Sequence, residues 1–368
     1  MGLTALQAHG EGLGAAGVGE YRGATTAARF GDPQAEFEAL RGGCGVYDLG
    51  FRAKISLTGG DRVRWLNGMV TNNIRDLAVG SGAYAFLLNP QGHILGDLYA
   101  YNRGESITVD TDAGQADKIL ATFDHYIIMD DVEVTNLSEQ LTALGIAGPK
   151  AREVLAAAGF TIPELRALQV QAVMWQGTEC ALVRGEDAEH LSYEIWLAPA
   201  SVKQLWDALR AAGAAPVGSE ALELHRIVSG IPQYGLDIRE RDLPQETEQA
   251  RALNFNKGCY VGQEIVERIR SRGAVHRKFT GFVAHGGEPI AVGAKAVAGE
   301  KEVGEITSAA SLRFAGMEKT VALGYIRREV GVPGREVMVG AAKVTVVQLP
   351  FADSVLLHEE SSLEQRPA

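Results

Sequence analysis

Cysteine is scarce in this sequence of 368 residues, which contains three of them: Cys44, Cys180 and Cys259. An odd, sparse set without paired spacing argues against a disulfide framework. Long apolar runs are also missing, since no stretch reaches the roughly 18 residues that a membrane-spanning helix needs. The N-terminal stretch lacks both a basic start and a long apolar segment, so it is not expected to be a signal peptide. These absences predict a cytoplasmic protein with no membrane partner.

Positive charge is in deficit as well, because 35 lysines and arginines face 46 aspartates and glutamates, for a formal net charge of −11. A general nucleic-acid binder needs a basic surface, so this class is excluded, although a local basic pocket is not. The eight histidines include no H-x-x-x-H pair, and no metal site is predicted. The stretch 12-GLGAAG-17 has the glycine spacing of a dinucleotide fingerprint, but no βαβ unit surrounds it, so it is not taken as a nucleotide site.

The order of the expected elements predicts a mixed α+β fold followed by a small barrel. Helical and strand-like segments alternate through the first three quarters of the chain. From about residue 279, short Val- and Gly-rich segments follow at regular spacing, which is typical of a β-barrel or sandwich. The predicted organisation is a flexible tail over residues 1–24, a core over 25–275, a barrel over 276–352 and a second tail over 353–368.

One short stretch, 257-KGCYVGQE-264, concentrates chemically useful residues. Cys259 follows Lys257 by two positions and precedes an expected helix over residues 261–269. A helix N-terminus and a nearby ammonium both stabilise a thiolate, so Cys259 could be a reactive thiol or a metal ligand that Lys257 assists. The alternative is a small residue buried under a turn, because free cysteine is often buried. The residues alone leave both interpretations open.

The same stretch resembles the signature of the YgfZ-like folate-binding proteins, which are relatives of aminomethyltransferase, the T protein of glycine cleavage. Other stretches that resemble this family are 70-VTNNI-74, 84-YAFLLNPQGHILGDLYAY-101, 226-RIVSGIPQYGLDI-238, 243-LPQE-246, 303-VGEITSAA-310 and 322-ALGYIRRE-329. The resemblance implies a T-protein-like ring of two intertwined α+β subdomains with a C-terminal β-barrel. It also implies that tetrahydrofolate binds in the central hole.

The resemblance further implies roles for individual residues. Asp97 matches the acid that approaches the reactive nitrogens of the folate, where a carboxylate can orient an amine or exchange a proton with it. Glu194 and Arg226 match the residues that bind the pterin ring, whose adjacent N–H donors a carboxylate can accept. Tyr84 and Tyr101 lie at matching points of the hairpin and are expected to pack against the folate rings. The plainer alternatives are a turn cap, surface charges and half-buried strand aromatics.

The chain departs from T proteins at two places. T proteins usually carry two acids at the hairpin, where this sequence has Gly96-Asp97, and they lack the cysteine-containing signature. Both differences favour the YgfZ branch, which is implicated in making or repairing iron-sulfur proteins and linked to tRNA modification through an iron-sulfur enzyme. A standard cluster needs about four thiolates, so Cys259 would supply a single ligand or redox contact to a partner's cluster.

Three functional interpretations remain open at this point. The first is a tetrahydrofolate-binding accessory protein for iron-sulfur cluster assembly or repair, with reduced folate and iron-sulfur proteins or their assembly factors as partners. The second is a folate-dependent one-carbon enzyme, an aminomethyltransferase or demethylase acting through Asp97. The third is a scaffold that kept the fold and lost the folate. Whether the protein catalyses a reaction is therefore left undecided.

Overall fold

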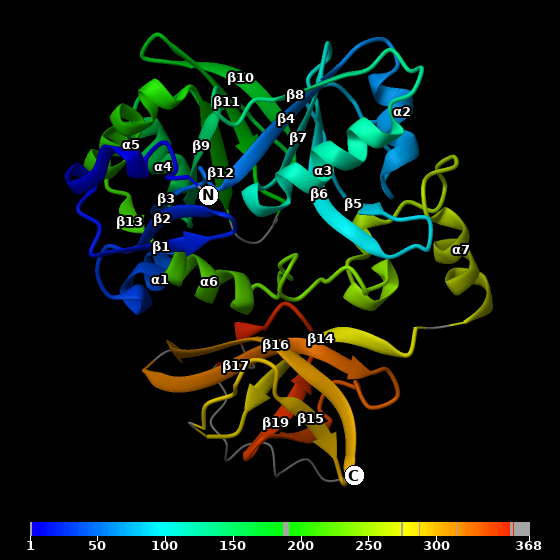
Figure 1. Cartoon of the computed structure of the whole chain (residues 1–368). Coiled ribbons are helices and arrows are strands. Elements are labelled where there is room, and N and C mark those ends of the chain that lie inside the picture. Colours follow the sequence, from blue (N-terminus) through cyan, green and yellow to red (C-terminus); the bar gives the residue numbers. More distant parts are fainter. Residues whose placement is uncertain are drawn as a thin grey trace. The chain divides into compact units, whose positions relative to one another are not determined.

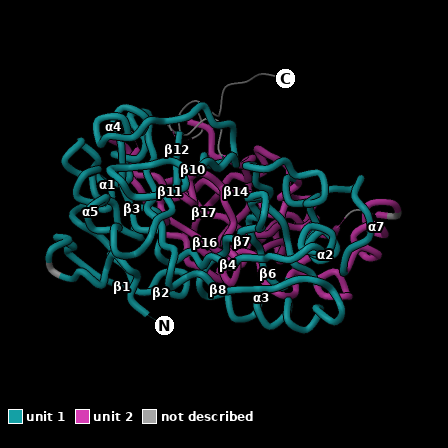
Figure 2. The backbone as a smooth tube through the Cα atoms, turned by 90° about the horizontal axis from the view of Figure 1, so that it is seen from above, with its two compact units in different colours: residues 1–88, 95–222, 251–261 teal, residues 89–94, 223–250, 262–368 magenta. Residues whose placement is uncertain are grey.

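The computed structural model describes residues 2–186, 191–273, 275–286, 288–314, 316–353 and 356. The chain divides into two compact units, drawn in teal and magenta in Figure 2. Unit 1 comprises Met1–Leu88, Leu95–Leu222 and Arg251–Val261, and unit 2 comprises Asn89–Ile94, Glu223–Ala250 and Gly262–Ala368. No helix among the described residues is both long and apolar enough to cross a membrane.

Unit 1 contains two large sheets. The six-stranded sheet has the order β10 (Val170–Trp175), β11 (Thr178–Arg184), β12 (Ser192–Leu197), β9 (Thr142–Ala147), β3 (Gly45–Asp48) and β13 (Ala215–Val217). The five-stranded sheet has the order β5 (Gly82–Leu88), β6 (Ile94–Asn102), β7 (Ile107–Asp112), β4 (Arg52–Thr58) and β8 (Glu133–Asn136). A separate antiparallel hairpin pairs β1 (Gly17–Tyr21) with β2 (Ala24–Arg29).

Helices cover these sheets. The helical elements of unit 1 are η1 (Gln7–Leu13), α1 (Pro33–Gly42), α2 (Arg62–Met69), α3 (Ala113–Tyr126), α4 (Ala151–Ala157), η2 (Pro199–Ser201), α5 (Val202–Ala211) and η4 (Ala250–Ala252). The helix α6 (Ser219–Val228) begins in unit 1 and ends in unit 2.

The five-stranded sheet has one apolar face and one polar face. Successive side chains of a strand point to opposite faces, so residues of one kind recur at every second position. Ile55 and Leu57 of β4 are fully buried in a core to which α2 and α3 contribute, and Phe123 of α3 is one of its members. Figure 1 labels these two helices and the strands of the sheet. Arg52 and Lys54 alternate with them and therefore lie on the opposite face.

The six-stranded sheet is two-sided in the same way. Ile195 and Leu197 of β12 belong to a core that α4 and α5 complete, with Trp206 of α5 fully buried there. Glu194 and Trp196 alternate with these residues and point to the other face of β12. Each large sheet thus has one face covered by helices and another that carries chemically active side chains.

The N-terminal segment folds onto unit 1. Leu6 and Leu13 are 2% and 1% exposed and belong to the same core as α4 and α5. The sequence predicts a flexible tail over residues 1–24, because this segment is rich in Gly and Ala and has no apolar period. The structure differs because two isolated leucines, seven positions apart, both reach the core, and β1 pairs with β2.

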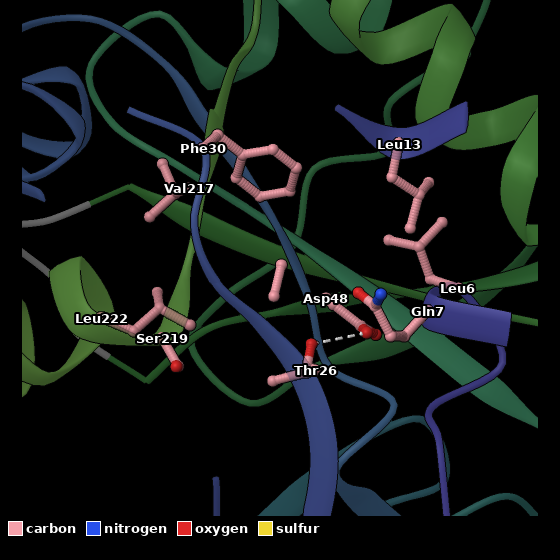
Figure 3. Close-up of a pocket in the computed structure, with 10 residues that line it drawn as sticks. Leu6, Gln7, Leu13, Thr26, Phe30, Asp48, Val217, Ser219 and Leu222 are labelled. Carbon is pink, nitrogen blue, oxygen red and sulfur yellow. Dashed lines mark hydrogen bonds between the residues drawn. The ribbon is translucent and has the colours of Figure 1, made fainter. Parts of the chain in front are cut away.

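A small cavity lies beside this segment, as Figure 3 shows. The cavity has a volume of about 10 Å³, which leaves room for about one water molecule. Asp48 in its wall accepts a hydrogen bond from the Thr26 hydroxyl at 2.9 Å, and burial raises the pKa of Asp48. The cavity is far too small for a cofactor-sized ligand, and the candidate site lies elsewhere in unit 1.

Unit 2 contains the predicted barrel, which the structure confirms as a closed six-stranded barrel. Its strands, in order around the barrel, are β14 (Arg277–Ala284), β17 (Met317–Arg327), β16 (Lys301–Phe314), β15 (Lys295–Ala298), β18 (Glu336–Val339) and β19 (Ala342–Val347). The unit also holds η3 (Pro244–Thr247) and α7 (Gln263–Arg272). Residues 223–250 and 262–275, expected with the core, belong to the unit of the barrel. The expected tail over 353–368 lies almost wholly outside the described residues.

We predict that Leu13→Ala lowers the free energy of unfolding by about 2–4 kcal/mol, because the substitution removes buried methyl groups and leaves a cavity. Urea denaturation measures this loss. Leu3→Ala is the matched control, since Leu3 is 60% exposed and its truncation should change stability little. Equal stability of the two variants would mean that residues before 14 are the loose tail that the sequence analysis expects.

Candidate functional site

A row of buried charges crosses the polar face of the five-stranded sheet. The antiparallel register sets Arg52 opposite Asp112 and Lys54 opposite Asp110. The Lys54 ammonium lies 3.0 Å from Asp110 Oδ1, and the Arg52 guanidinium lies 3.1 Å from the same oxygen and 2.6 Å from Asp112 Oδ1. Arg22, in the β1–β2 turn, approaches Asp112 at 3.4 Å. Ion pairs this deeply buried are stable only when each charge has partners, and this row supplies them.

Asp97 of β6 lies next to this row and is held by two side chains. The Tyr84 hydroxyl donates to Asp97 Oδ2 at 2.6 Å, and Gln115 Nε2 donates to Oδ1 at 2.8 Å. The backbone N–H of Asp97 donates to Gln115 Oε1 at 3.0 Å, so one glutamine fixes both the main chain and the carboxyl group. Burial, and then the charge of Asp112, raise the pKa of Asp97. A fixed carboxyl group with a raised pKa suits proton transfer.

Glu194 of β12 is the second carboxyl group with a raised pKa. Its Oε2 accepts a hydrogen bond from Trp196 Nε1 at 2.8 Å. Burial raises the pKa of Glu194, followed by the charge of Asp110, while Lys54 and Arg52 act in the opposite direction. Glu194 is partly exposed, whereas the side chains of Lys54 and Asp110 are 0% and 1% exposed. The pKa of the partly exposed Glu194 carboxyl group is therefore influenced by charges that are themselves fully buried.

Aromatic rings connect the neighbourhoods of Asp97 and Glu194. Ring centroids are separated by 4.9 Å between Tyr84 and Tyr99, by 6.4 Å between Tyr99 and Tyr101, and by 5.1 Å between Tyr101 and Trp196. The Arg251 guanidinium lies 4.2 Å from the centroid of Tyr84, in the range of a cation–π contact. We call Tyr84, Tyr99, Tyr101 and Trp196 the aromatic row. A carboxyl group is hydrogen-bonded to the residue at each of its ends.

This arrangement fits a planar ligand that presents N–H donors. Aromatic faces bind flat rings, and carboxylates accept paired N–H donors. Asp110 Oδ2 is a buried acceptor with no hydrogen-bond partner among the residues that the structure describes. Buried polar atoms are normally satisfied, so an unsatisfied acceptor beside the Glu194 end of the row is a property expected of a binding site. The residues present are therefore compatible with the pterin ring of a folate.

Arg226 is surrounded by polar groups of unit 2. Its guanidinium pairs with Asp237 at 2.5 Å and with Glu223, and it donates to the Ser308 hydroxyl at 2.8 Å and to the backbone oxygen of Ile231 at 2.7 Å. The side chain is 4% exposed. These contacts tie the end of α6 to strand β16 within unit 2. The pterin-binding role of Arg226 stays a prediction.

Lys257 is buried under the end of α2. Its ammonium donates to the backbone oxygens of Asn67, Val70 and Asn72, the last at 2.8 Å. Burial, and then the charge of Arg75, lower its pKa to about 7. The sequence analysis expects Lys257 to support the thiolate of Cys259, whereas the structure directs its ammonium to carbonyl groups at the helix end. A cationic cap at a helix C-terminus is favourable because unpaired carbonyls collect there.

Cys259 is exposed, whereas Cys44 and Cys180 are buried. Burial raises the pKa of Cys44 to about 12 and that of Cys180 to about 11, so both are inert thiols near neutral pH. The expected helix begins at Gln263, with Gly262 as its N-terminal cap. Cys259 therefore lies four positions before the first helical residue. Its chemical role stays a prediction.

Sequence reasoning missed the buried charges behind the site. The residues it missed are Arg22, Arg52, Lys54, Asp110, Asp112, Gln115 and Arg251. A signal was present, because 52-RAK-54 and 110-DTD-112 place like charges at every second position of two strands. Opposite charges with the same period on two strands indicate cross-strand pairs. By contrast, Asp97, Tyr84, Tyr101 and Glu194 were singled out in advance, and the structure brings these four into unit 1.

We predict that Glu194→Gln gains stability relative to the wild type as the pH rises. Because the folded pKa of Glu194 is raised, the folded state holds a proton that the unfolded state loses above about pH 4.3. The free energy of unfolding of the wild type therefore falls as the pH rises from the unfolded-state pKa toward the higher folded-state pKa of Glu194. The neutral glutamine does not titrate, so the variant does not lose this stability. Glutamine can still accept the Trp196 hydrogen bond.

Urea unfolding at about pH 4.5 and about pH 8 measures this difference. Glu179→Gln on β11 is the matched control, since Glu179 is exposed. A stability difference between Glu194→Gln and the wild type that stays constant across the two pH values would contradict the raised pKa.

Known proteins resemble this chain over most of its length. Residues 11–257 match the family model of the GCVT N-terminal domain. An aminomethyltransferase of Rubrobacter xylanophilus is 30% identical over 348 residues, which cover 90% of this chain and 89% of that protein. An aminomethyltransferase of Herpetosiphon aurantiacus is 30% identical over 368 residues, covering 95% of this chain and 98% of that protein.

The fold also matches a solved structure. The crystal structure of the glycine cleavage system aminomethyltransferase T from Bartonella henselae superposes with a TM-score of 0.85 at 23% identity. The match covers 96% of this chain and 98% of that chain, so the predicted T-protein-like α+β fold with its barrel is confirmed. The family model and the two relatives place the chain in the aminomethyltransferase family that carries the GCVT N-terminal domain.

Proposed function

We propose that this protein is a folate-dependent one-carbon transferase of the aminomethyltransferase type, with tetrahydrofolate as its ligand. The observation that carries the proposal is the aromatic row with Asp97 bonded at one end and Glu194 at the other. The names of the relatives favour this alternative over the accessory role that the sequence analysis put first, and they give no support to an iron-sulfur function. A cytoplasmic location is a further part of the proposal, whereas a place in the YgfZ-like branch belongs to the second candidate function below.

Each residue of the candidate site has a separate role toward tetrahydrofolate in this proposal. Tetrahydrofolate would supply the amine nitrogens that accept the one-carbon unit. Glu194 would accept the N–H donors of the pterin edge, and Tyr84 and Tyr101 would pack against the rings. Asp97, fixed by Tyr84 and Gln115, would orient an amine nitrogen of the ligand and exchange a proton with it.

Arg226 would act differently from Glu194 in this scheme. The resemblance assigns it to the pterin ring, but its guanidinium already contacts Asp237, Glu223 and Ser308. Removing it leaves the buried carboxylate of Asp237 without its cation, which costs stability whether or not a ligand binds. Arg226 variants are therefore poor probes of binding, and Glu194 and Asp97 are better ones.

We predict that Glu194→Gln weakens the binding of tetrahydrofolate and of its 5-formyl analogue at least tenfold, because a neutral amide cannot accept two charge-assisted N–H donors. Asp97→Asn should bind within a few-fold of the wild type but form product at least about 100-fold more slowly, as expected when a proton-transfer group is lost. Anaerobic calorimetry measures binding, and product formation from an aminomethyl or methylamine donor measures turnover.

Glu179→Gln serves as the control in both assays, since Glu179 is exposed on β11. Failure of the wild type to bind either folate would overturn the proposal and favour the scaffold interpretation. Binding without any product from either donor would instead favour a folate-binding accessory protein.

The second candidate function is that accessory role, and the exposure of Cys259 favours it. An exposed thiol in a protein whose other cysteines are buried is accessible to a partner's cluster. Under this alternative, the protein binds reduced folate and contacts iron-sulfur proteins or their assembly factors through Cys259.

We predict, for this candidate, that Cys259→Ala fails to restore iron-sulfur enzyme activity in cells that lack the protein. Asn256→Ala, an exposed position of the same loop, should restore it fully. Full restoration by Cys259→Ala would remove the cysteine-dependent role and leave the transferase as the remaining proposal.

A further inference from the structure

Asp97 and Asp112 form a pair of carboxyl groups on neighbouring strands. The last paired residues of β6 and β7 at this end are Tyr99 and Asp110, and Asp97 and Asp112 each lie two positions further toward the same end. The Thr111 hydroxyl donates to the backbone oxygen of Asp97 at 2.8 Å, which keeps the two strands together at this point. Side chains two positions apart on a strand share a face, so both carboxyl groups lie on the polar face of the sheet, where the charge of Asp112 acts on Asp97.

The two members of this pair have different surroundings. Asp112 Oδ1 is contacted by two guanidinium groups, from Arg52 at 2.6 Å and from Arg22 at 3.4 Å. Burial opposes ionisation of Asp112, but the two arginines outweigh it and lower its pKa. Asp97 has Tyr84 and Gln115 as hydrogen-bond partners, and burial and Asp112 raise its pKa. When the pKa values of two adjacent acids are displaced in opposite directions, one acid stays ionised and the other is the one that exchanges a proton.

The pair is embedded in a larger set of charges. The titratable and charged groups that face it are Tyr84 of β5, Tyr99 and Tyr101 of β6, Asp110 of β7, Arg52 and Lys54 of β4, Arg22 of the β1–β2 turn, Glu194 of β12, Arg251 of η4 and Glu186, which pairs with Arg251. Four cations thus face five carboxyl groups. Complete ionisation leaves one uncompensated negative charge in a buried region, and a proton on one carboxyl group removes it.

We propose that Asp112 is a positioning residue for Asp97: clamped by Arg22 and Arg52, it stays ionised and makes Asp97 the member of the pair that binds and releases the proton. The inference rests on the proposed function in that the ligand's amine nitrogen is the proton's other site. One proton moves between Asp97 and that nitrogen, and solvent restores the starting state. The charge on Asp97 changes by one, while that on Asp112 does not change.

The test is a titration of carboxyl ¹³C signals in the ligand-free, aspartate-labelled protein, with the Asp97 signal assigned by its loss in Asp97→Asn. Asp112→Asn should move the Asp97 midpoint down by about one pH unit, because a like charge is removed. Tyr84→Phe should move it up, because a hydrogen bond to the ionised form is lost. General loosening of the site would move both variants the same way, so the opposite signs are diagnostic.

An unchanged or higher midpoint in Asp112→Asn would overturn the inference. Arg22→Gln covers the case in which Asp112→Asn does not fold. Without one of its two arginines, Asp112 should titrate at a higher pH than in the wild type, and an unchanged Asp112 curve would equally overturn the inference. Circular dichroism reports whether each variant is folded.

The result can be separated from the fate of the proposed function. The titration uses no folate, so a protein that binds no folate still gives a readable answer on the pair. If the protein does turn over, Asp112→Asn should shift the Asp97-dependent limb of the pH–rate profile by the same amount as the NMR midpoint. A role of Asp112 in structure alone would lower the rate at all pH values without moving that limb.

Discussion

The pairing of Lys54 and Arg52 with Asp110 and Asp112 is the interaction on which the site depends. A lone charge transferred from water to a protein interior costs several kcal/mol, so none of these side chains can be buried without the others. Their cross-strand pairing fixes the alignment of β4 and β7. On its other side β7 pairs with β6, which brings Asp97 near Asp112, and Asp110 with its cations acts on Glu194. The aromatic row keeps water away from the same region, which strengthens every electrostatic interaction there.

Local patterns in the sequence were sufficient for much of the fold. The short segments after residue 279 recur at strand-like spacing, and the structure closes them into a barrel. The hairpin that carries Tyr84, Asp97 and Tyr101 is visible because two largely apolar segments flank a Pro-Gln-Gly turn. Such patterns are local, so they can be recognised in the sequence without knowledge of the tertiary structure.

The parts that could not be predicted depend on distant partners. Arg52 and Lys54 look like surface residues until Asp110 and Asp112, almost sixty positions later, are known to lie opposite them. Leu13 offers no periodic pattern, and its burial depends on α4 and α5 of a core formed much later in the chain. Resemblance to a family supplied Glu194, which periodicity alone would have left as an outward-facing charge.

The strict alternation in β7 has a consequence for how this protein can change over time. A strand whose faces differ this sharply tolerates substitution far better than a shift of one position, since a shift exchanges the two faces. Deleting Thr108 would shift the following residues by one position, which carries Asp110 and Asp112 toward the apolar core beneath α3 and turns Val109 toward the charges. We therefore expect changes in length to be tolerated in connections such as the turn before β7. Within the strand, an insertion or deletion would exchange its charged and apolar faces.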